Sequence, residues 1–133
     1  MFRLGPLVGA AETGMSVYEV PPGQAICPYH YENGEEEWLV VLTGRPTLRH
    51  PDGSDALEPW DVVCFPSGPE GAHAVRNDTE ETVRVLMFST VRHPAVTVYP
   101  DSDKLGVWTS KDKVDNVIVR RSSNVDYYDG ETT

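Results

Sequence analysis

The chain has 133 residues, of which 39% are hydrophobic, and it contains 11 Gly and 11 Pro. This length suits one domain with a substantial buried core, and the frequent turn formers favour many short strands over long helices. The formal net charge of -10 argues against a nucleic-acid partner, because phosphate binding needs clustered Lys and Arg. We therefore expect one acidic, all-β domain over residues 1–133.

The sequence also gives expectations about location. No run approaches the roughly 18 apolar residues of a membrane span, and the segment MFRLGPLVGAAETG lacks the sustained apolar centre of a secretory signal. Cys27 and Cys64 are spaced neither as a Cys-x-x-Cys motif nor as a disulfide framework. We therefore expect two buried free thiols, a cytoplasmic location and no membrane partner.

Short strands are predicted at close spacing along the first two thirds of the chain. Apolar and β-branched runs bounded by turn formers indicate strands within 14–23, 24–31, 37–43, 47–50, 55–57, 62–65, 73–77 and 82–90. The Asp52-Gly53 pair is a strong hairpin signal between two of them. Such spacing is typical of a sandwich or barrel, with a core over about 15–91. Trp38, Phe65 and Phe88 are expected in that core.

Residues 92–133 form a C-terminal extension with a different character. This segment is polar and rich in turn formers, with short apolar pieces such as Val117-Ile118-Val119. We expect it to wrap the barrel or to pair with another copy, with its last residues frayed. Because sheets with open edges readily pair with a second chain, a homodimer formed by strand or tail exchange is an expected assembly.

Four side chains carry the chemistry predicted from the sequence, namely His30, Glu32, Glu37 and His73. Successive side chains of a strand point to opposite faces, so His30 and Glu32 share one face with Cα atoms roughly 6.5 to 7 Å apart. Glu37 opens a strand, and the alternation of the segment HAVRN allows His73 to close the set. Imidazole and carboxylate groups bind divalent Fe, Mn, Ni and Zn, so we predict a site for one such ion.

These residues resemble the two motifs of the cupin superfamily. The matching positions are His30, Glu37 and Gly44 in the first motif, and Pro66, Gly68, His73 and Asn77 in the second. Glu32 stands where most cupins carry a second His. The resemblance covers about half of the chain. It implies a small double-stranded β-helix, or jelly-roll barrel, with the ion near its centre, and it implies that the position of Glu32 is a ligand position.

The reaction depends on what Glu32 does. If only His30, Glu37 and His73 bind, the set resembles the two-His-one-carboxylate face of iron(II) oxygenases, including dioxygenases. If Glu32 is a fourth ligand, the metal is better suited to Lewis-acid chemistry, as in isomerases, epimerases and lyases. Glu32 is alternatively a catalytic acid or base whose pKa the ion depresses. The sequence leaves these alternatives open.

Two function classes follow for the chain. The first is a metal-dependent enzyme of oxygenase or isomerase/lyase type, acting on a small organic substrate held in an apolar barrel lumen. The second is a non-catalytic cupin-like module that binds a small molecule or serves as an accessory domain. Turnover by the metal-loaded protein would distinguish them.

Overall fold

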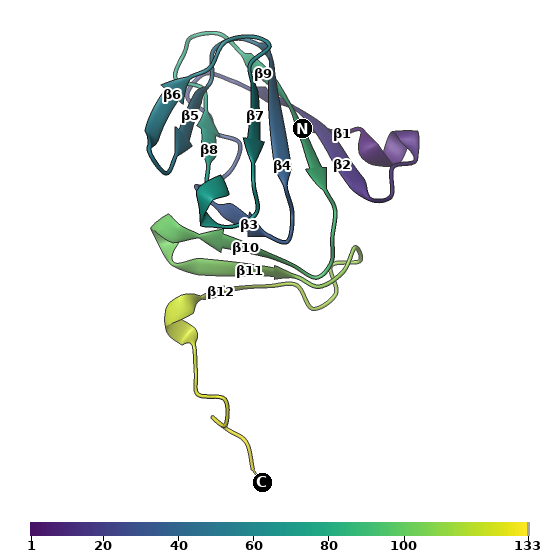
Figure 1. Ribbon diagram of the computed structural model, residues 1–133, viewed down its shortest axis with the longest axis vertical. Helices are drawn as coiled ribbons and strands as arrows, with labels where there is room; N and C mark the ends of the chain where they lie inside the picture. Colours follow the sequence, from purple (N-terminus) through teal and green to yellow (C-terminus); the bar gives the residue numbers. More distant parts are fainter. Residues whose placement is uncertain (133) are drawn as a thin grey trace.

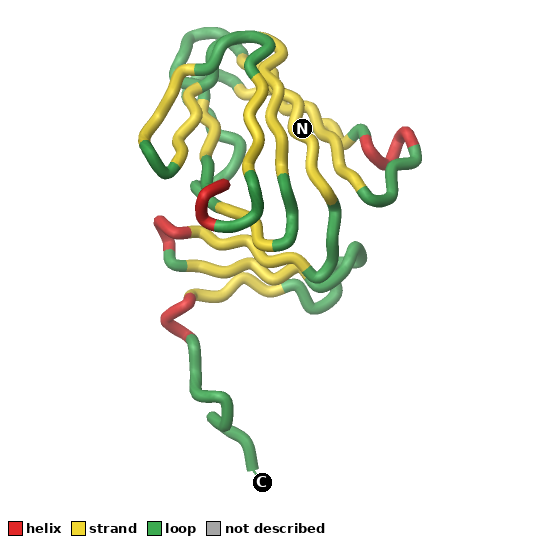
Figure 2. The backbone as a smooth tube through the Cα atoms, viewed as in Figure 1, coloured by secondary structure: helices red, strands yellow, loops and turns green. Residues whose placement is uncertain are grey.

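The computed structural model describes residues 1–132, and strands make up most of its regular structure (Figures 1 and 2). None of the helices in this part of the chain has the length and hydrophobicity needed to cross a membrane. The elements, in chain order, are β1 (Phe2–Arg3), η1 (Gly5–Val8), β2 (Thr13–Val20), β3 (Tyr31–Asn33), β4 (Glu37–Thr43), β5 (Thr47–His50), β6 (Gly53–Ala56), β7 (Val62–Phe65), η2 (Pro69–Gly71), β8 (Ala74–Arg76), β9 (Val83–Thr90), β10 (Ala95–Tyr99), η3 (Pro100–Ser102), β11 (Lys104–Trp108), β12 (Val117–Arg120) and η4 (Arg121–Ser123), where η denotes a 3-10 helix.

Two antiparallel sheets form the wall of the barrel. One has the order β1-β2-β9-β4-β7 and the other the order β6-β5-β8. Every second residue of β4 and β9 points inward, so Leu39, Val41, Val83 and Val85 are fully buried. These residues belong to one hydrophobic cluster with side chains from the smaller sheet, including Val75. The prediction of an all-β fold is confirmed.

The C-terminal extension supplies most of a third sheet. Its order is β12-β11-β10-β3, so three strands from the extension join β3, a strand from the first predicted motif. This sheet crosses the end of the barrel at which β3 and η2 lie (Figure 1). Residues 95–108 therefore close one end of the barrel beside the predicted site residues.

The structure corrects three expectations. The strand predicted over 24–31 is wrong. Between β2 and β3 the described chain forms only isolated bridges, at Ala25 and His30, because Pro28 has no N–H to donate to a strand ladder. Trp38 was expected in the core but is 39% exposed, since its neighbours in β4 point inward. Cys64 was expected to be buried but is exposed for the same reason in β7. Both cysteines are free.

Candidate metal centre

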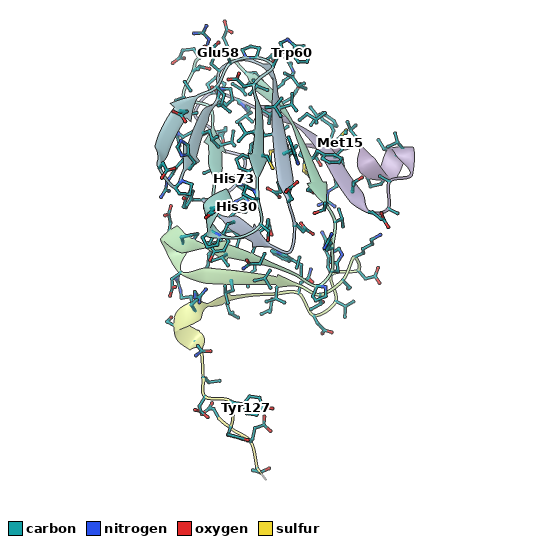
Figure 3. All side chains as sticks on the ribbon, in the orientation of Figure 1. Met15, His30, Glu58, Trp60, His73 and Tyr127 are labelled. Carbon is teal, nitrogen blue, oxygen red and sulfur yellow. The ribbon has the colours of Figure 1, made fainter. Side chains whose placement is uncertain are left out.

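The two predicted histidines are held together by the backbone. His30 directly precedes β3, and His73 lies between η2 and β8. The His30 N–H donates to the His73 carbonyl at 3.1 Å, and the His73 N–H donates to the His30 carbonyl at 2.8 Å. Their ring centroids lie 4.6 Å apart, near the end of the barrel opposite to Glu58 and Trp60 (Figure 3). Reciprocal main-chain bonding therefore sets the spacing of the two rings.

A hydrogen bond and a stacked ring fix the imidazole of His73. Its Nδ1–H donates to the Gly71 carbonyl at 2.9 Å, and the Phe65 ring stacks on it at 3.6 Å between centroids. The turn before it requires a glycine, because a Cβ at Gly71 would lie 1.8 Å from the Pro66 carbonyl oxygen. Such support around a ligand fixes both the tautomer and the direction of the ring.

His30 makes the corresponding hydrogen bond. Its Nδ1–H donates to the Pro28 carbonyl at 2.8 Å, so in the neutral form of either histidine the Nε2 atom carries a lone pair instead of a hydrogen. The exposed fractions are only 6% for His30 and 1% for His73. Burial, followed by the nearby His73, lowers the pKa of His30. The neutral imidazole favoured by this environment is the form that binds metals.

Glu37, the first residue of β4, completes the group from the inward face of that strand. Its Oε2 lies 3.2 Å from His73 Nε2, yet neither buried atom has a hydrogen-bond partner in the described residues. When the His73 ring is neutral and its hydrogen is on Nδ1, the two atoms are both acceptors whose lone pairs face each other. Buried acceptors without a donor are costly, and a cation between them would satisfy both.

The donor atoms of His30, Glu37 and His73 all lie within 4.8 Å of one another. Two imidazole nitrogens and one carboxylate oxygen suit divalent Fe, Mn, Ni or Zn. The chemistry of the donors and the two unpaired buried atoms thus fit a metal ion, which these three residues would hold. Three of the four predicted ligands are brought together.

Glu32 lies beside this group rather than within it. Its Oε1 is 3.7 Å from His30 Nε2, while its Oε2 accepts a hydrogen bond from Thr97 Oγ1 at 2.8 Å. Burial raises the pKa of Glu32 to about 7, against the smaller opposing effect of the Thr97 hydrogen bond. The carboxyl group is therefore held next to the metal ligands and is able to exchange a proton near neutral pH.

Thr97 and Trp108 are functional-site residues that the sequence did not reveal. Thr97 of β10 lies directly opposite Glu32 in the pairing with β3, and the Trp108 indole N–H donates to Thr97 Oγ1 at 2.7 Å. Gly106 makes room for the indole, since a Cβ there would lie 2.6 Å from the ring. The alternating segment AVTVY indicates a strand, but nothing in it identifies β3 as the partner.

Two of the candidate metal ligands, His30 and Glu37, border a small cavity of about 140 Å³. Burial, with the charges of Glu37 and Glu32, raises the pKa of Cys27 to about 12, so this thiol stays protonated and is a poor metal ligand. The lining residues are Gly14, Ser16, Tyr18, Ile26, Cys27, His30, Glu37, Met87, Phe88 and Ser89. The cavity has room for the reacting end of a small molecule.

Comparison with known proteins agrees with the predicted fold. A family model described as a cupin domain matches residues 16–89, whereas no curated protein matches the chain significantly. A candidate sugar phosphate isomerase from Acidithiobacillus ferrooxidans is 27% identical, with a TM-score of 0.84, over 93% of this chain and 77% of that one. The predicted double-stranded β-helix is confirmed.

Two further structures show how far the likeness extends. A sugar phosphate isomerase of the cupin superfamily from Silicibacter pomeroyi is 24% identical, with a TM-score of 0.83, over 96% of this chain and 79% of that one. A cupin conserved-barrel protein from Salinispora arenicola is 28% identical, with a TM-score of 0.52, over 61% and 65%. The alignment with the Silicibacter protein covers 96% of this chain and therefore includes most of the C-terminal extension, which is about a third of the chain.

Proposed function

The chain belongs to the cupin family, and from this membership we propose that it is a metal-dependent isomerase of a small sugar derivative. The single observation that carries the proposal is the arrangement of three convergent side chains able to hold a metal ion, with a further carboxyl group beside them. His30, Glu37 and His73 offer mutually close donor atoms, and Glu32 lies 3.7 Å from the nearest of them.

Isomerisation of an aldose to a ketose needs a group that polarises the carbonyl and a group that transfers a proton between carbon atoms. The metal ion, when bound, would polarise the carbonyl and the neighbouring hydroxyl of the substrate. Glu32 as a carboxylate would accept the proton from the carbon next to the carbonyl and return it to the carbonyl carbon, while a hydroxyl hydrogen moves from one oxygen to the other. The reaction is redox-neutral overall and needs no oxidant. In the protein without metal, burial raises the pKa of Glu32 to about 7, and a bound cation would lower it and favour the carboxylate that accepts the proton.

The comparisons favour isomerase over oxygenase chemistry. The Acidithiobacillus relative, named as a candidate sugar phosphate isomerase, aligns over 93% of the chain and so reaches well into the C-terminal extension that supplies Thr97 and Trp108. These residues position Glu32, a group that oxygenase chemistry does not require. The two-His-one-carboxylate set remains the observation in favour of an iron(II) dioxygenase, which is the second candidate.

The test is proton exchange by the metal-loaded protein. Incubated in D2O with small aldoses and ketoses, with and without phosphate groups, the protein is expected to place deuterium on the carbon next to the carbonyl, as followed by NMR. Chelation of the metal should abolish the exchange, and readdition should restore it. Substrate-dependent oxygen uptake without exchange would support the dioxygenase, and binding without either would support the non-catalytic module.

We also propose that two copies associate through β12. This strand is an edge of its sheet, and its residues Val117, Ile118 and Val119 are 44%, 53% and 40% exposed. Antiparallel pairing with a second β12 would satisfy the free backbone groups and cover these side chains.

Light scattering after size exclusion should therefore give a dimer for the natural chain and a monomer for Ile118→Lys. Val125→Lys, which changes an exposed tail residue, is the matched control and should remain dimeric. A monomeric natural chain would contradict the assembly.

We also propose a cytoplasmic location. The two free thiols are consistent with a reducing compartment.

A further inference from the structure

A second cavity lies next to the one at the metal ligands. It has a volume of about 640 Å³, and it shares Gly14, Ser16 and Ser89 with the smaller cavity. All three are small residues, two on β2 and one on β9, so only small side chains stand between the two cavities along this wall. Together the two spaces are large enough for a small substrate.

The second cavity is lined by cationic side chains. Arg3, Lys111 and Lys113 border it together with His93, and no Asp or Glu is among its lining residues. The chain as a whole has 21 acidic residues and only 11 Lys and Arg. The charged residues that line this cavity are therefore of the opposite sign to the net charge of the chain. The charge of His93 acts on the acid Glu35, which does not line the cavity. A cleft lined by one sign of charge concentrates ions of the other sign.

These three cations are also without acidic partners. Within residues 1–132, ion pairs join Arg45, Arg49, Arg76 and Arg84 to carboxylates, but none involves Arg3, Lys111 or Lys113. They come from two distant parts of the chain, because β1 holds Arg3 and the loop between β11 and β12 holds both lysines. This loop is braced by Thr109, whose N–H donates to Asn116 Oδ1 at 2.9 Å and whose hydroxyl donates to the Val114 carbonyl.

The strand register connects the two cavities geometrically. Glu37 of β4 lies opposite Ser89 of β9, which in turn lies opposite Gly14 of β2. Ser89 thus lines the basic cavity one interstrand step of about 4.8 Å from the metal ligand, and Gly14 lines it two steps away, at roughly 10 Å. Arg3 is paired with Ser16 on the next strand. The spacing suits a short carbon chain with its reacting end at the metal and an anionic group at the far end.

We propose that the basic cavity is the binding site for the phosphate group of the substrate, with Arg3, Lys111 and Lys113 as its cationic contacts. The inference rests on the proposed function, an isomerase of a small sugar derivative, and narrows the substrate to a phosphorylated sugar. The guanidinium of Arg3 donates to two phosphate oxygens at once, and the two ammonium groups supply further charge. The metal centre then acts only on the carbonyl end, so the charged end sets specificity.

Inorganic phosphate is the probe for this site. The metal-loaded protein is expected to bind phosphate in isothermal titration at low ionic strength, and the affinity should persist after chelation of the metal. Lys111→Ala with Lys113→Ala should weaken binding at least about tenfold, and Arg3→Ala by a similar factor, as expected for lost charge-assisted hydrogen bonds. Metal content should stay unchanged in all these variants.

Arg120→Ala with Arg121→Ala removes the same charge as the lysine pair, away from the cavity, and should bind phosphate as the natural chain does. The site is overturned if the natural chain binds no phosphate, if binding disappears on chelation, or if the control weakens as much as the lysine variant. Because the phosphate readout does not depend on turnover, absence of deuterium exchange would contradict the proposed function while leaving this site standing.

Discussion

Glu37→Gln is expected to lower the affinity for divalent metal by more than about 100-fold, because even partners outside the ligand set contribute about 10- to 100-fold to affinity. The variant removes the one negative charge among the three mutually close donors. The barrel should stay folded, since its core consists of apolar side chains from β4, β9 and the smaller sheet. Competition against a chromophoric chelator measures the affinity, and thermal unfolding in the presence of chelator measures the fold.

Glu36→Gln is the matched control for this variant. It makes the same change in charge one residue earlier, at an exposed position whose carboxylate accepts only a hydrogen bond from Trp38, and metal affinity should be unaffected. Equal affinity in the natural chain and the Glu37→Gln variant would refute the site. Unfolding of the variant would instead show that Glu37 has a structural role.

Glu32→Gln is expected to reduce the rate of proton exchange by about 10²- to 10⁴-fold, the usual contribution of a general acid or base, while metal affinity changes little. The amide retains the shape of the side chain and can still accept the hydrogen bond from Thr97 Oγ1, but it cannot take up a proton. Deuterium incorporation and metal titration on the same preparation give both quantities.

Comparison with Glu37→Gln separates the two roles of a carboxylate at this site. A proton-transfer group loses rate and keeps metal, whereas a ligand loses both. If Glu32→Gln loses metal as severely as Glu37→Gln, Glu32 is a fourth ligand, as its position in the motif implies, and the acid/base role is wrong. Thr97→Ser retains the hydroxyl that contacts Glu32 and should behave nearly as the natural chain.

The barrel and the ligand group were predictable because they follow from local rules. The two-residue period of β4 places Glu37, Leu39 and Val41 on the inner face, and the Asp52-Gly53 pair gives the hairpin of β5 and β6. The motif spacing placed His30 and His73 together, which the backbone bridge between them confirms. The same period, applied more strictly, would have placed Trp38 outside.

The surroundings of Glu32 were not predictable from the sequence. Whether it joins the ligands depends on Thr97, which lies 65 residues away on a strand whose partner is not specified by composition. The basic cavity has the same origin, because β1 and the loop after β11 meet only in the folded molecule. Pairings between distant segments depend on the whole set of competing contacts, so no local pattern reports them.

The joining of β10 to β3 divides the site between two parts of the chain. Residues up to about 91 contain His30, Glu37 and His73, together with the strands β2, β4, β7, β8 and β9. The restraint on Glu32 comes instead from Thr97 and Trp108 of the C-terminal extension. The three mutually close donors and the carboxyl group beside them thus depend on different stretches of the chain for their positions.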